Sequence, residues 1–147
     1  AAQMLEDDFG VSADVWSVTS FNELRREGME VDRWNMLNPG KKQKQCWARQ
    51  QLGKATGPVV AATDYMKVYA DQIRPYIDAR YRVLGTDGFG RSDSREKLRH
   101  FFEVDRRFVV VAALKALADD GELEAKAVAD AIKRLGIDPE KPYPPKH

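Results

Sequence analysis

The chain has 147 residues, with 24 basic and 23 acidic side chains and a formal net charge of +1. This length fits one domain, and 43% hydrophobic with 32% charged residues fit a folded, soluble protein. The charge balance excludes a broad field that would attract nucleic acid, and no apolar run reaches the about 18 residues of a membrane span. We therefore expect neither nucleic acid nor a membrane as a partner.

The amino end predicts a helix, a strand and a second helix. Residues 1–9 are spaced as an amphipathic helix that Gly10 closes, and the β-rich run at 14–19 is typical of a mostly buried strand. Ser20 followed by Glu23 forms a capping box, which opens a helix. We expect Gly28 to interrupt that helix, which then continues to Asn38-Pro39-Gly40.

The rest of the chain alternates strands and helices. We expect helices at 45–52, after Thr63-Asp64 as far as Pro75, at 108–117 and at 123–135, and strands at 58–62 and 81–85. Three consecutive valines leave 108–117 open to a strand, but its apolar length and its end at Asp119-Asp120-Gly121 favour a helix. Residues 1–137 form the expected folded part, and 138–147 an extended proline-rich tail.

The alternation predicts an α/β fold with a mostly parallel sheet covered by helices on both faces. Such sheets are built from strand–helix–strand units, yet the first predicted element is a helix with no strand before it. Three strands are also few for so many helices. We expect a partial domain that lacks its first one or two strands on the amino side.

The run from Tyr81 to Asp105 contains the most informative motif. A short strand leads into a loop with Gly85, Gly88 and Gly90, after which Asp93 stands three residues before Glu96, as an N-cap before its partner. This glycine loop, residues 85–94, could direct backbone N–H groups at an anion, with side-chain donors from Arg91, Ser92 and Ser94. Its spacing matches neither the dinucleotide fingerprint nor the P-loop. A tight turn with local salt bridges is the simplest interpretation, and a subunit interface is the first functional one.

No catalytic or metal-binding constellation is visible. The only histidines, His100 and His147, lie far apart, and His100 precedes two phenylalanines as a packing residue would. The single cysteine, Cys46, excludes an intrachain disulfide and favours a reducing compartment such as the cytoplasm. The basic run at 41–44 has the pattern of a solvated loop.

Several segments, in order, resemble the carboxyl-terminal part of the homodimeric, bacterial type of pyruvate dehydrogenase decarboxylating component. They are residues 17–24 (SVTSFNEL), 32–37 (DRWNML), 63–67 (TDYMK), 83–105 and 128–132 (VADAI). The resemblance covers nearly the whole chain, and residues 39–57 depart from it most. It implies a three-layer α/β/α domain like the transketolase carboxyl-terminal domain, with strands near 14–19, 58–62 and 81–85.

The resemblance also implies a parent oxidoreductase that links glycolysis to acetyl-CoA. Such an enzyme uses thiamine diphosphate and Mg²⁺ to decarboxylate pyruvate and acetylates the lipoyl group of the acetyltransferase component of a multienzyme complex. The family's cofactor motif and catalytic residues do not occur in this chain, so we expect it to bind no cofactor and to be inactive alone. Its expected partners are the remainder of the enzyme and the dimer mate.

Two alternatives stay open. The chain could be a stand-alone α/β module that binds a phosphorylated ligand at the glycine loop, or an interaction domain of an unrelated assembly.

Overall fold

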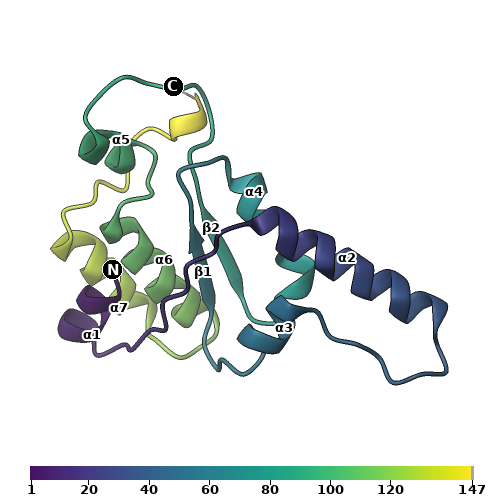
Figure 1. The fold of residues 1–147 in the computed structure, drawn as a ribbon. Coiled ribbons are helices and arrows are strands. Elements are labelled where there is room, and N and C mark those ends of the chain that lie inside the picture. Colours follow the sequence, from purple (N-terminus) through teal and green to yellow (C-terminus); the bar gives the residue numbers. More distant parts are fainter. Residues whose placement is uncertain (147) are drawn as a thin grey trace.

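The structure, a computed structural model, describes residues 1–146 (Figure 1). Its helices are α1 (Ala2–Phe9), α2 (Phe21–Leu37), α3 (Trp47–Leu52), α4 (Lys67–Asp71), α5 (Arg95–Phe101), α6 (Arg106–Asp119) and α7 (Ala125–Arg134). The strands are β1 (Val59–Ala62) and β2 (Tyr81–Leu84), and two 3₁₀ turns are η1 (Arg74–Tyr76) and η2 (Pro144–Lys146). Within residues 1–146, no helix combines the length and apolar character that a bilayer crossing needs.

The two strands form a parallel pair in which Val59 lies opposite Tyr81 and Ala62 opposite Leu84. Both strands were predicted from their short β-rich runs, and the observed bounds differ from the prediction by one residue. Because the strands are parallel, their connection must cross over, and α4 and η1 lie in that connection. The expected α/β class with a parallel sheet is confirmed.

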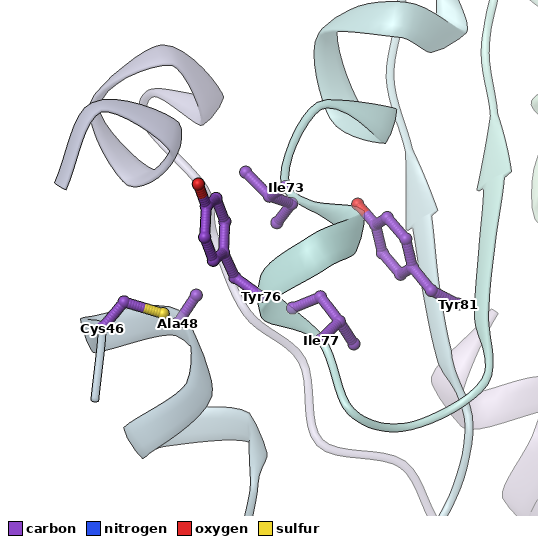
Figure 2. Close-up of a cluster of buried hydrophobic side chains, with 6 residues drawn as sticks. All are labelled: Cys46, Ala48, Ile73, Tyr76, Ile77 and Tyr81. Atoms are coloured by element: carbon purple, nitrogen blue, oxygen red, sulfur yellow. The ribbon is translucent and has the colours of Figure 1, made fainter. Parts of the chain in front are cut away.

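Helices cover both faces of this sheet. On one face, α2, α3, α4 and η1 enclose a core of Cys46, Ala48, Ile73, Tyr76, Ile77 and Tyr81, and Val59 and Val83 pack against it (Figure 2). On the other face lies α6, which contacts both strands (Figure 1). The far side of α6 joins α1 and α7 in a second core built on Leu5, Val110, Leu114, Val128 and Ala131. The long α6 is therefore central to the domain.

The predicted strand at 14–19 was wrong. The segment between α1 and α2 has no strand structure, and Val15, Trp16 and Val18 are 80%, 50% and 41% exposed instead of buried. A strand requires a neighbour that offers N–H and C=O groups, and no described strand pairs with this segment. Its largest side chain, Trp16, instead packs edge-on against Trp47, with ring centroids 6.4 Å apart.

The helix that begins after Ser20 was predicted correctly at its start and wrongly in its middle. The Ser20 hydroxyl accepts a hydrogen bond from the backbone N–H of Glu23 at 3.2 Å. Gly28 does not interrupt α2, which runs through it. A Cβ at this position would lie 2.5 Å from ring carbons of Tyr76, so the glycine is needed for the packing of the helix on that ring. The glycine therefore lets the helix approach the buried tyrosine.

Two further local predictions need correction. Thr63 and Asp64 do not cap the next helix, since α4 begins at Lys67, whose N–H donates to the Asp87 carboxylate from a different loop. The carboxyl-terminal tail, expected to be extended, contains the turn η2, and Pro144 in it is buried. The ambiguous run at 108–117 is helical, as predicted, within α6.

Candidate functional site

The candidate site lies where both strands end. Because β1 and β2 are parallel, residues 63–66 and the glycine loop emerge at the same edge of the sheet. The two loops are joined by hydrogen bonds from Thr63 N–H to the Leu84 carbonyl (3.0 Å) and from Thr86 N–H to the Tyr65 carbonyl (2.9 Å). The Thr86 hydroxyl also donates to the Asp64 carbonyl at 2.7 Å. We call these two loops, together with the start of α4, the carboxyl-edge surface.

Gly85 is required by this close contact between the loops. A Cβ there would lie 2.8 Å from both the Lys67 nitrogen and the Tyr65 carbonyl oxygen. Two residues later, an Asp87 carboxylate oxygen accepts the Lys67 backbone N–H at 2.9 Å. The chain's own carboxylate therefore occupies a position at the start of α4 where an external anion could otherwise dock.

The start of α5 is also satisfied internally. Its N-cap is Ser94, whose hydroxyl accepts the Lys97 N–H at 3.4 Å, so the prediction of Asp93 as the cap was wrong by one residue. Asp93 instead accepts the N–H of Ser94 at 2.7 Å. Because serine and aspartate both cap well, the sequence pattern alone could not choose between adjacent positions.

The middle of the loop is exposed. Gly88 has a φ of 101° and touches the carboxyl-terminal segment, since a Cβ there would lie 3.1 Å from the Cα of Pro145. Gly90 has open space around it, and Ser92 is exposed. The Arg91 guanidinium lies over the ring of Phe101 at 4.2 Å from its centroid. The predicted donors Arg91, Ser92 and Ser94 therefore share one exposed loop.

A bidentate ion pair fastens α5 to the other loop of the edge. Arg99 donates from Nε and Nη2 to the two carboxylate oxygens of Asp64, at 3.3 and 2.8 Å. The hydrogen bonds that Arg99 donates to Asp64 raise the pKa of Arg99, which remains a cation. The edge is therefore held by side chains as well as by backbone contacts.

Sequence reasoning missed a polar cluster at the junction of α5 and α6. Asp105 caps α6 by accepting the N–H groups of Arg107 (2.8 Å) and Phe108 (3.2 Å), and Arg107 Nη2 donates to it at 2.7 Å. Burial acts to raise the pKa of Asp105, but these hydrogen bonds outweigh it and hold the pKa below its ordinary value. His100 Nδ1 lies 3.3 Å from Asp105 and 2.9 Å from Arg107, and its ring packs on Phe108. The cluster is a helix cap, whose only sequence signal was an aspartate three residues before the apolar run that begins at Phe108.

The described residues do not fit a thiamine diphosphate and Mg²⁺ site. Magnesium requires clustered oxygen ligands, and residues 1–146 hold no group of three or more His, Cys, Asp or Glu side chains that could bind a metal ion. Among the same residues, no buried side-chain polar atom lacks a hydrogen-bond partner. We therefore assign no step of cofactor chemistry to these side chains.

Comparisons with known proteins agree with the arrangement of elements. The model of the transketolase-like TK C-terminal domain matches residues 1–105. The chain is 63% identical over 145 residues to the pyruvate dehydrogenase E1 component of Pseudomonas aeruginosa, and 56% identical over 145 residues to that of Escherichia coli K12. It is 55% identical over 144 residues to that of Cupriavidus necator. Each match covers 98% of this chain and 16% of the relative, so the chain spans about a sixth of the length of these curated relatives.

Proposed function

The chain belongs to the transketolase-like TK C-terminal domain family, and we propose that it is the carboxyl-terminal structural domain of a pyruvate dehydrogenase E1-type enzyme. The observation that supports this most strongly is the 63% identity to a pyruvate dehydrogenase E1 component across 98% of the chain. The enzyme to which the domain contributes would use thiamine diphosphate and Mg²⁺ to decarboxylate pyruvate. It would then acetylate the lipoyl group of the acetyltransferase component.

Within that enzyme, the domain supports the dimer and the cofactor-bearing domains and supplies no catalytic group. The proposal is supported by the carboxyl-edge surface, which is rigid yet exposes large apolar side chains. Phe89 is 86% exposed, and Tyr65, Met66 and Tyr69 are also exposed. Exposed aromatic groups on a preorganised surface are typical of protein interfaces. We propose that the glycine loop, including Gly85, Gly88, Gly90, Arg91, Ser92 and Ser94, contacts the rest of the enzyme or its dimer mate there.

The alternative of a module that binds a phosphorylated ligand has less support. The N–H of Lys67 donates to Asp87, and the N–H groups of Ser94 and Lys97 donate to Asp93 and Ser94. An entering phosphate would have to displace two carboxylates of the chain, which also repel it.

The buried thiol of Cys46 is compatible with the cytoplasm, which we propose as the compartment.

A chimera tests the proposed function. This chain would replace the matching 145 residues of the Pseudomonas aeruginosa relative. We expect the chimera to retain pyruvate-dependent activity, and a version of the relative without the replaced residues to lose it. The isolated 147-residue chain should neither bind thiamine diphosphate nor turn over pyruvate. A folded but inactive chimera, or turnover by the chain alone, would contradict the proposal.

A further inference from the structure

The carboxyl-terminal segment lies across the carboxyl edge of the sheet. In Figure 1 the last turn, η2, sits beside the glycine loop, although residues 95–143 separate the two in sequence. The segment begins with a turn in which Asp138 accepts the backbone N–H of Glu140 at 2.9 Å. It then makes contacts with both ends of the region that runs from the glycine loop to the end of α5.

The first contact joins Lys141 of this segment to the end of α5. Its Nζ donates to the carbonyls of Phe101 (2.6 Å) and His100 (3.3 Å) and to the Glu103 carboxylate (3.2 Å). An ammonium group has three donors, so all three are satisfied. The last carbonyls of a helix lack partners within the helix, and they carry partial negative charge. Lys141 therefore supplies both hydrogen bonds and an opposite charge to the end of α5.

The surroundings of Lys141 strengthen this contact. The side chain is only 17% exposed, and Nζ lies 5.3 Å from the ring centroid of Phe101 and 5.6 Å from that of Phe108. Water competes little for hydrogen bonds at such a position, so charge-assisted bonds there are stronger than on the surface. The lysine thus holds the segment to α5 and α6 through a partly buried cation.

The second contact reaches the glycine loop itself. The buried Pro144 and the adjacent Pro145 lie against Gly88, whose missing side chain and positive φ make the approach possible. Beside them, the Lys67 Nζ lies 5.8 Å from the Tyr143 ring centroid and 3.9 Å from the Asp87 carboxylate. The loop is therefore covered near Gly88 by the same segment that holds the far end of α5.

We propose that residues 141–145 are a latch that keeps the glycine loop ordered. With the latch in place, the loop is held at Gly88 and, through α5, at Phe101. Release of the latch would mobilise residues 86–94 and leave the two-stranded sheet intact. By ordering the loop, the latch would also set how the exposed Phe89 is presented to a partner. This consequence rests on the proposed function.

Hydrogen–deuterium exchange of the full 147-residue chain tests the latch. Lys141→Met keeps the apolar stem and removes the ammonium, and Lys133→Met, at an exposed position near the end of α7, is the matched control. We expect Lys141→Met to speed exchange at residues 86–94 by roughly tenfold, the size that loss of charge-assisted hydrogen bonds gives. Exchange in β1 and β2 should stay as in the wild type, and the control should change neither region.

A second pair of variants tests the other contact without touching Lys141. Pro144→Ala, which removes part of the buried ring beside Gly88, should speed exchange of the same loop, whereas Pro139→Ala, at an exposed position outside residues 141–145, should not. Unchanged loop exchange in Lys141→Met, or equally faster exchange in loop and strands, would overturn the latch. Because the measurement requires no partner and no enzyme activity, its outcome is independent of the chimera experiment.

Discussion

Replacing Gly85 by alanine tests whether the carboxyl-edge surface is as tightly joined as its contacts indicate. Gly85 does not have a positive φ, so alanine meets no backbone strain there and the effect isolates the steric contact. The new Cβ would lie 2.8 Å from the Lys67 nitrogen and the Tyr65 oxygen, both backbone atoms. Relief requires the 65–67 segment to move away from the start of the glycine loop.

That movement strains two hydrogen bonds of 2.9 Å, from Thr86 to the Tyr65 carbonyl and from Lys67 to Asp87. Overpacking costs roughly 1–3 kcal/mol and one weakened hydrogen bond about 1 kcal/mol, so Gly85→Ala should lower the free energy of unfolding by about 2–4 kcal/mol. Urea unfolding followed by circular dichroism measures this.

Gly90→Ala is the matched control for this substitution. No atom lies within 4 Å of its added Cβ, and we expect a change within about 0.5 kcal/mol. A Gly85→Ala variant as stable as this control would refute the reasoning.

Three further outcomes follow from other groups. Burial and the nearby Asp71 carboxylate raise the pKa of Tyr81 to about 12, so the unfolded chain loses this proton first as the pH rises. The free energy of unfolding should therefore fall by up to about 1.4 kcal/mol per pH unit between pH 10 and 12, a slope that urea titrations should find flatter in Tyr81→Phe. The pKa of Asp105 is lower in the folded chain than its ordinary value of 3.8, so the ionised carboxylate stabilises the fold at pH values above 3.8. This stabilisation is lost as the pH falls through the pKa of the folded state. Asp105→Asn should thus be less stable than the wild type by about 1–2 kcal/mol at pH 7, with a difference that shrinks in acid; a constant difference would contradict this. In the chimera, Phe89→Asp should weaken dimerisation at least about tenfold by sedimentation velocity, whereas Met36→Asp, exposed on α2, should not, and equal effects would count against the carboxyl-edge surface as the interface.

The sheet was predictable only where the chain supplies both partners. The runs at 59–62 and 81–84 have β-rich composition and pair with each other, so local propensity and tertiary contacts agree. The run at 14–19 has the same composition, but with no described strand beside it, its apolar side chains stay exposed. Composition indicates that a segment can form a strand, and pairing determines whether it does.

The ends of helices show a similar division. Ser20 was recognisable because its partner N–H lies three residues away in sequence. The partner at the start of α4 is Asp87, 20 residues further along the chain, and no local pattern could indicate it. Gly28 was misjudged for the same reason, since the ring of Tyr76 that it accommodates is distant in sequence.

The glycines of the sequence indicated the candidate loop, but the contacts that decide whether it can bind an anion are made by residues that belong to no motif. Gly85, Gly88 and Gly90 marked the loop, and a glycine loop before a helix suggested an anion site. The side chains of Asp87 and Asp93 occupy the N–H groups on which that interpretation depended. Lys141 and the prolines of the tail hold the loop from outside, while Phe89 is exposed to solvent. A loop of this construction offers a partner a fixed apolar contact, and that is why we favour an interface over a ligand site.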